Sequence, residues 1–144
     1  VTADPTVHRR LVERLNSKIQ NNAHAIAESE DYNLDDCEVG IVSCGCTSRT
    51  VYEAVENAEK KGIKVGYIRL RTIWPFPDET INKMAETAKT IIVPEVNLRQ
   101  LYYEVQRAAK GQAPVSSLNK IGGGELITPD ELLAKIAEVR TKND

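Results

Sequence analysis

The sequence contains few aromatic residues, few histidines and no long apolar run. Aromatic residues make up 5% of the 144 residues, with a single Trp, a single Phe and two His. The longest apolar runs, "GIV" and "TIIV", are far too short to cross a bilayer, and no signal peptide with a basic start and an apolar core is visible. The sequence therefore argues against a membrane protein and predicts a cytoplasmic one.

An excess of basic charge is also missing. Lys and Arg number 19 against 21 Asp and Glu, which gives a formal net charge of −2. Nucleic-acid-binding domains usually carry a basic patch, so no nucleic acid partner is indicated. The hydrophobic share of 41% and the charged share of 28% are typical of a globular chain with one core. Because the sequence opens without an initiator Met, we expect an excised domain of a longer protein or a processed product.

The three cysteines do not form a recognisable framework. Cys37, Cys44 and Cys46 are an odd, clustered set, which argues against disulfides and fits reduced thiols inside a cell. The C-x-C spacing of the last two lacks the paired C-x-x-C pattern of zinc and iron–sulfur sites. With His8 and His24 both in a predicted surface helix, the sequence predicts structural thiols, no metal site and no catalytic triad.

The N-terminal segment has helical periodicity. Apolar residues recur every three or four positions over residues 5–27, with Asp4 as a plausible N-cap and Pro5 in the first turn. We expect an amphipathic helix within residues 1–30 that packs on the domain formed by residues 31–144.

Apolar runs and helical patterns alternate in the rest of the chain. Strands are expected at "CEVGIVSC", "IKVGYIRL", "KTIIVPEV" and "APVSSLNKI", whereas the polar stretch "ESEDYNLDD" is expected to be a loop. The last helix begins with a capping box of Thr128 and Glu131, and Pro129 stands between them. Four strands alternating with helices predict a three-layer α/β domain with a mainly parallel sheet.

Ligands of such sheets bind beyond the carboxyl ends of the strands. After the first predicted strand, Gly45, Thr47, Ser48 and Arg49 offer backbone N–H groups and a guanidinium that would suit a carboxylate or phosphate. The alternative is ordinary close packing of small residues at a strand-to-helix turn, because no nucleotide-loop motif is present. The glycine run of residues 122–124 is interpreted as a turn for the same reason.

A second strand-end loop contains Glu95, Asn97 and Gln100. Asn97 can cap the following helix, and this structural role would account for it. Glu95 ends an apolar strand, so its carboxylate must be solvated or paired, and Arg49 is a possible partner. Together with the preceding loop, these residues form the candidate ligand crevice.

The block "RTIWPFP" holds the only Trp and the only Phe of the chain. Pro75 and Pro77 exclude helix at Trp74 and Phe76, so a stiff segment displays the two rings just before a helix begins. The rings either cover this domain's own core or anchor a neighbouring domain or subunit, where Trp is over-represented. These four residues form the candidate interface.

Four blocks together resemble a known family. "GIKVGYIRLRTIWPFPDE", "VSCGCTSRTVYEAVENAEKKG", "TIIVPEVNLRQLYYEVQR" and "KIGGGELITPDELL" are similar to the C-terminal, transketolase-like domain of the alpha subunit of 2-oxoacid:ferredoxin oxidoreductases. The W-P-F-P form is most similar to the 2-oxoglutarate enzymes, with pyruvate and branched-chain 2-oxoacids left open. Family members commonly carry Gly where this chain has Arg99.

The resemblance implies a role inside an enzyme. Such enzymes oxidatively decarboxylate a 2-oxoacid with thiamine diphosphate and Mg, pass electrons through iron–sulfur clusters to ferredoxin, and transfer the acyl group to coenzyme A. Thiamine diphosphate is held between an upstream domain of the alpha subunit and the beta subunit. The resemblance thus implies a non-catalytic interface domain, inactive alone and binding no cofactor itself, within a hetero-oligomer that includes both neighbours and reaches ferredoxin through the complex. The first helix would be the connector from the upstream domain.

Two other interpretations remain open. The chain could be the corresponding domain of a transketolase or of a dehydrogenase E1 beta chain. It could also be a free-standing regulatory module that holds a small anion near Arg49 and Glu95.

Overall fold

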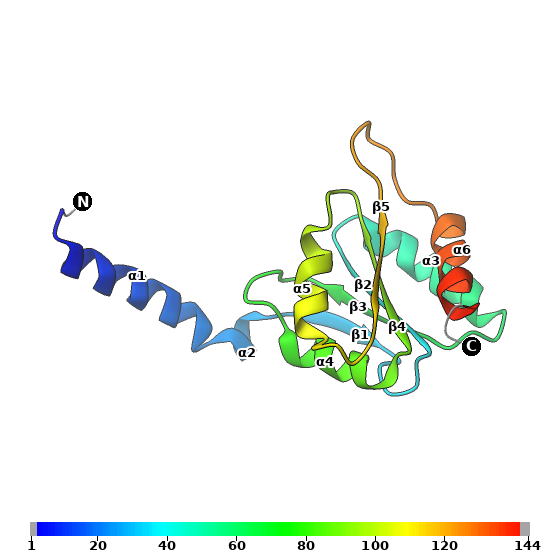
Figure 1. Ribbon diagram of the computed structural model, residues 1–144, viewed down its shortest axis with the longest axis horizontal. Coiled ribbons are helices and arrows are strands. Elements are labelled where there is room, and N and C mark those ends of the chain that lie inside the picture. The colour runs from blue at the N-terminus through cyan, green and yellow to red at the C-terminus, as the bar shows by residue number, and fades with distance from the viewer. Residues whose placement is uncertain (1–2, 142–144) are drawn as a thin grey trace.

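The computed structural model describes residues 3–141. They form a helical arm, residues 5–26, and one α/β unit, residues 29–141 (Figure 1). The strands are β1 (Ser29–Tyr32), β2 (Val39–Cys44), β3 (Val65–Leu70), β4 (Thr90–Glu95) and β5 (Val115–Asn119). The helices are α1 (Pro5–Gln20), α2 (Ala23–Ile26), α3 (Thr47–Glu59), α4 (Asp78–Thr87), α5 (Gln100–Ala108) and α6 (Pro129–Thr141). Within this described range, no helix is long and apolar enough to cross a membrane.

The sheet has the strand order β1-β3-β2-β4-β5. β2 pairs in parallel with both β3 and β4, and β4 pairs in parallel with β5. The predicted α/β fold with a mainly parallel sheet is therefore confirmed.

The strand β1 is an addition to the four predicted strands. It lies in the stretch expected to be a loop and pairs antiparallel with β3 at the sheet edge, with Ser29 opposite Leu70. Its sequence SEDY has no alternation of apolar and polar residues. Two of its four residues are exposed in the structure and none is fully buried. The backbone of β3 supplies the pairing that local sequence could not indicate.

Helices cover both faces of the sheet and make three layers. On one face, Ile41 and Ile92 pack with residues of α3 and α6. On the other face, Val42 and Ile91 pack with residues of α4 and α5. Adjacent strand residues thus enter opposite cores, as the period of two along a strand requires, and the buried strands read as continuous apolar runs.

The helix α1 projects away from the α/β unit, so the expectation that it packs on the domain is wrong (Figure 1). The predicted single helix is divided at Asn21 and Asn22 into α1 and the short α2. α1 has no buried residue, although its apolar stripe is as predicted and Asp4 caps it by accepting hydrogen bonds from the Thr6 and Val7 amides. Periodicity identified the face, but the α/β unit offers no surface beneath it. The boundary between residues 30 and 31 stays a prediction.

The predicted capping box opens α6. The Thr128 amide donates to Glu131 Oε2 at 2.8 Å, and the Glu131 amide donates to Thr128 Oγ1 at 3.3 Å. The hydrogen bond from the Thr128 amide to the carboxylate, with Lys120 beside the carboxylate at 2.9 Å and the Thr128 hydroxyl, lowers the pKa of Glu131 to about 2. The start of α6 is therefore specified by local sequence, as expected.

Candidate functional site

The two candidate regions lie at different places on the α/β unit. The crevice residues follow β2 and β4, where successive connections leave in opposite directions along the sheet. Pairing between these strands joins Val39–Ile41 to Thr90–Ile92 and includes none of the last three residues of either strand. The carboxyl ends of β2 and β4 therefore part at this switch point.

The loop after β2 satisfies its own polar groups. Thr47 Oγ1 donates to the Cys44 carbonyl at 2.8 Å, and the hydroxyls of Ser43 and Ser48 are hydrogen-bonded to each other at 3.0 Å. Thr47 and Ser48 are both buried, whereas Arg49 is exposed. The packing interpretation thus accounts for the two hydroxyl residues, whereas the charged side chain of Arg49 is presented to solvent.

Gly45 makes the tight turn at the end of β2. Its φ is +63°, in the left-handed region that glycine adopts without strain. This turn directs the chain from the buried strand into α3, so the glycine has a structural explanation that needs no ligand.

The carboxylate of Glu95 is bound by the start of α5. The side chain is 4% exposed, and its two oxygens accept hydrogen bonds from the amides of Leu101 at 2.8 Å and Tyr102 at 2.9 Å. Asn97 Oδ1 accepts the amide of Gln100 at 3.0 Å, which is the capping role predicted for it. Two acceptor side chains therefore occupy the N–H groups that would otherwise bind an anion.

Arg49 is not the partner of Glu95 in the described part of the chain. The carboxylate instead completes the backbone hydrogen bonding of α5 and complements the positive end of the helix dipole. Sequence alone could not identify this pairing, because Leu101 and Tyr102 contribute their backbone, which carries no residue signature.

Two of the three cysteines, Cys37 and Cys44, lie in environments that favour the neutral thiol. Burial raises the pKa of Cys44, and the negative charge of Glu95 raises it further. Burial likewise raises the pKa of Cys37. All three cysteines are free, and nowhere in residues 3–141 do three His, Cys, Asp or Glu side chains gather as metal ligands.

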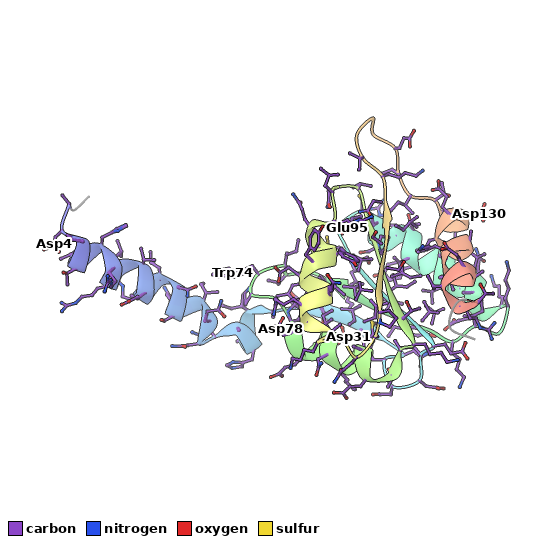
Figure 2. All side chains as sticks on the ribbon, in the orientation of Figure 1. Asp4, Asp31, Trp74, Asp78, Glu95 and Asp130 are labelled. Atoms are coloured by element: carbon purple, nitrogen blue, oxygen red, sulfur yellow. The ribbon has the colours of Figure 1, made fainter. Side chains whose placement is uncertain are left out.

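The W-P-F-P segment divides its two rings between core and solvent. Pro75 is buried, and Phe76 packs against the core beneath α4 and α5, with the Arg107 guanidinium 5.8 Å from its ring centre. Ile73 and Trp74 are instead 54% and 57% exposed. Trp74 lies on the side of the α/β unit that faces the arm (Figure 2). One ring therefore anchors the segment, and the other is displayed.

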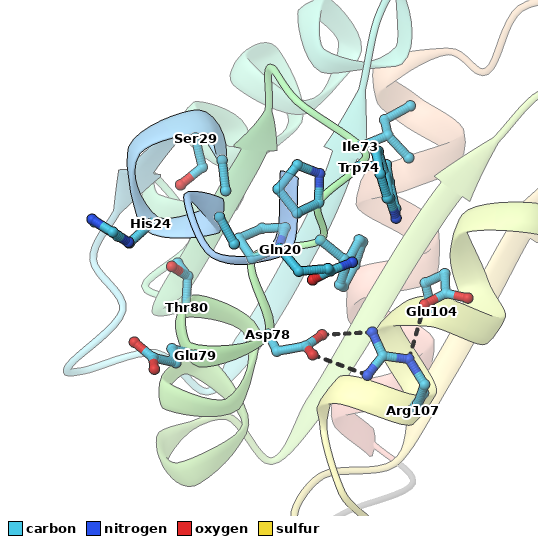
Figure 3. A pocket seen from close by; sticks show the side chains of 15 residues that line it. Gln20, His24, Ser29, Ile73, Trp74, Asp78, Glu79, Thr80, Glu104 and Arg107 are labelled. Atoms are coloured by element: carbon cyan, nitrogen blue, oxygen red, sulfur yellow. Dashed lines mark hydrogen bonds and ion pairs between the residues drawn. The ribbon is translucent and has the colours of Figure 1, made fainter. Parts of the chain in front are cut away.

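A pocket of about 860 Å³ separates this segment from the end of the arm (Figure 3). Gln20 and His24 line its arm side, and Trp74 lines the opposite side. In its wall, Arg107 donates two hydrogen bonds to Asp78, at 2.6 and 3.0 Å. The guanidinium is thus already paired, and these contacts hold its pKa above the usual range.

Sequence reasoning did not identify Asp78 or Arg107. Asp78 resembles an ordinary acid in the first turn of a helix, and Arg107 lies 29 positions further along the chain. Only the packing of α4 beside α5 brings the pair together. The lining of the pocket therefore combines this charged pair with the apolar surface of Trp74.

The layers and strand order define a transketolase C-terminal-like α/β domain. A split-gene transketolase, described as an inactive beta4 tetramer, has this fold at a TM-score of 0.66 and 18% identity, over 80% of this chain and 42% of that chain. This likeness shows the fold alone.

Closer relatives define the family. The family described as pyruvate:ferredoxin oxidoreductase core domain II matches residues 37–132, so the chain belongs to it. The 2-oxoglutarate synthase subunit KorA of Methanothermobacter marburgensis is 43% identical over 134 residues, which cover 93% of this chain and 36% of the relative. The structure of 2-oxoglutarate:ferredoxin oxidoreductase from Magnetococcus marinus, with 2-oxoglutarate, coenzyme A and succinyl-CoA bound, matches with a TM-score of 0.78 at 26% identity. That match covers 96% of this chain and 24% of that chain.

These findings confirm the resemblance drawn from the sequence blocks. The chain is the transketolase C-terminal-like domain of a 2-oxoacid:ferredoxin oxidoreductase alpha subunit, most similar to the 2-oxoglutarate type. It spans about a third of the length of the KorA relative.

Proposed function

We propose that the chain is a non-catalytic interface domain in an enzyme that oxidatively decarboxylates 2-oxoglutarate to an acyl-CoA and reduces ferredoxin. The choice of 2-oxoglutarate rests on the names of the KorA relative and of the Magnetococcus marinus structure. The proposed partners are the upstream alpha-subunit domain and the beta subunit in a cytoplasmic hetero-oligomer, with ferredoxin reached through the complex.

The exposure of Trp74 supports this function most directly. Its neighbour Pro75 is buried and Phe76 packs on the core, so the segment that presents the indole is held on the domain's own core. An indole that is 57% exposed leaves much apolar surface in water. Trp is also the residue type most enriched among the side chains that dominate binding energy at interfaces. We therefore assign Trp74 as the interface anchor, with Pro75, Phe76 and Pro77 as its support.

The proposed enzyme needs thiamine diphosphate with Mg, iron–sulfur clusters and coenzyme A. Iron–sulfur clusters require several thiolates, whereas burial favours the neutral thiol at Cys37 and Cys44. Among the described residues, no three His, Cys, Asp or Glu side chains gather as ligands for a metal ion such as Mg. These residues do not fit the metal-containing groups. The proposal therefore assigns those groups to other parts of the enzyme and no chemical step to this domain.

The first test is the native protein that carries this sequence. Its intact mass and its co-purifying subunits should show a chain well above 16.0 kDa accompanied by a brown iron–sulfur subunit. A native product of this mass travelling alone would contradict the proposal.

The second test replaces the anchor in the native complex. Trp74→Ala should weaken association of the subunits or domains by about tenfold or more, because interface Trp residues often contribute over 1.4 kcal/mol. Tyr103→Ala is the matched control, since Tyr103 is a similarly exposed ring, at 58%, on α5. Association measured by mass photometry that is equal for Trp74→Ala and the wild type would contradict the anchor role.

The geometry gives less support to the alternative of a small-anion regulator near Arg49 and Glu95. The Glu95 carboxylate places negative charge in the crevice and occupies the α5 amides. A regulator that binds the native domain would stabilise it. Saturable thermal stabilisation of the chain by a small dicarboxylate or by phosphate would favour that alternative, and its loss in Arg49→Ala would locate the site.

A further inference from the structure

The helix α1 leaves an apolar face uncovered along its whole length. None of its 16 residues is buried, and it extends beyond the α/β unit (Figure 1). Val7, Leu11 and Leu15 are 49%, 41% and 53% exposed, and Val12 beside them is 51% exposed. An isolated helix of this length is marginally stable in water. The face therefore needs a covering surface.

The apolar face is bordered by basic side chains on one edge. Val7, Leu11 and Leu15 follow one another at four-residue spacing and form a stripe. A second row with the same spacing starts three residues later and therefore runs beside the stripe. It consists of Arg10, Arg14 and Lys18, all exposed. The surface that covers this stripe should combine an apolar groove with a border of carboxylates.

A second copy of α1 does not have that character. The segment Pro5–Gln20 contains four basic residues, including Arg9, and a single acid, Glu13. Two such helices packed through their stripes would bury the apolar residues but would leave the basic rows without acidic partners. Charge therefore favours a different surface.

The C-terminal end of the arm is fixed to the α/β unit. The backbone amides of Arg71 and Thr72 donate to the Glu28 carbonyl, and Thr72 Oγ1 donates to the Ile26 carbonyl at 3.1 Å. These bonds hold α2 and the start of β1 and so set where α1 begins its projection. A domain that precedes α1 in the same subunit would be tethered at the opposite end and would meet the stripe at a high effective concentration.

We propose that α1 docks in an apolar groove bordered by Asp and Glu on the upstream domain of the alpha subunit. The inference rests on the proposed function, which supplies that domain. The Magnetococcus marinus structure supports this proposal. Its match covers 96% of this chain, so the match includes α1. The matched part is only 24% of that chain, so α1 has its counterpart within a much longer chain. The arm is then the part of the domain that fixes its orientation to the rest of the subunit.

The test measures hydrogen exchange of the α1 amides in the native alpha subunit, alone and with the beta subunit. Arg14→Glu and Leu11→Gln should each speed exchange of α1 by about tenfold, because each removes one component of the proposed contact. Arg9→Glu is the matched control: it makes the same charge reversal on the same helix but lies off the stripe and its basic edge. Its exchange should equal that of the wild type.

Three results would overturn the docking. In the first, α1 exchanges rapidly in the intact alpha subunit. In the second, its protection arises only when the beta subunit is added. In the third, the protection of α1 is lost on dilution together with self-association of the alpha subunit. A brown native complex whose α1 is unprotected would overturn the docking and leave the proposed function intact, whereas a lone 16.0 kDa product would overturn the function itself.

Discussion

Arg99 occupies a backbone conformation that favours glycine. Its φ is +68°, in the left-handed region, at the position just before α5. The left-handed conformation costs a non-glycine residue about 1–2 kcal/mol, and glycine recovers part of this while losing more entropy on folding. Arg99→Gly should therefore be more stable than Arg99→Ala by about 1 kcal/mol, measured by urea unfolding of the chain.

The alanine variant is the matched control for this prediction. Both substitutions remove the guanidinium, which lies 5.8 Å from the Tyr102 ring centre, so their difference isolates the backbone. Equal stability of the two variants would show that the turn relaxes to accept a side chain.

At the scale of elements, β1 is held at the sheet edge by Glu30. This carboxylate accepts hydrogen bonds from the guanidiniums of Arg71 and Arg69 and from the hydroxyl of Tyr52. These partners, Arg71 foremost, lower the pKa of Glu30 from 4.5 to about 2. A depressed pKa stabilises the folded state fully above pH 4.5, and that contribution is lost as the pH falls through 2.

Glu30→Gln should therefore destabilise the chain more at pH 7 than near pH 2. The measurement is the difference in unfolding free energy between wild type and variant across this range. Glu131 also titrates near pH 2, but it is present in both proteins and cancels in the difference. A difference that does not change with pH would mean that the Glu30 contacts do not favour its charged form.

At the scale of the whole molecule, α1 and the α/β unit are energetically separate within this chain. α1 contributes no buried residue to either core cluster. Removal of residues 1–20 should therefore change the Tm of the chain by less than about 2 °C, measured by circular dichroism. Leu132→Ala is the control that shows the sensitivity of the assay, because Leu132 is 0% exposed and its truncation should cost about 2–5 kcal/mol. A large fall in Tm on truncation would show that α1 packs on the unit.

Sequence reasoning succeeded where local chemistry is sufficient. The apolar runs around Ile41 and Ile91 predicted buried parallel strands, and Thr128 with Glu131 predicted the start of α6. Asn97 was correctly interpreted as a cap. Each of these signals depends on residues close together in the chain, where backbone geometry follows directly from residue type.

Sequence reasoning failed where the partner is distant or is backbone. β1 forms only because β3 pairs with it, and Glu95 is bound by amides that any residue would supply. The expectation that α1 packs on the domain failed for a related reason. Periodicity shows that a face is apolar, but it does not show which surface covers it.

Residue order and composition were enough to specify the alternation of strands and helices, the helix caps and the blocks that mark the family, because these depend on short-range periodicity and residue type. Folding in three dimensions decided the rest. It presented Trp74 while burying Pro75 beside it, paired Arg107 with Asp78, and left the stripe of α1 uncovered, because each of these outcomes depends on which distant segments come into contact.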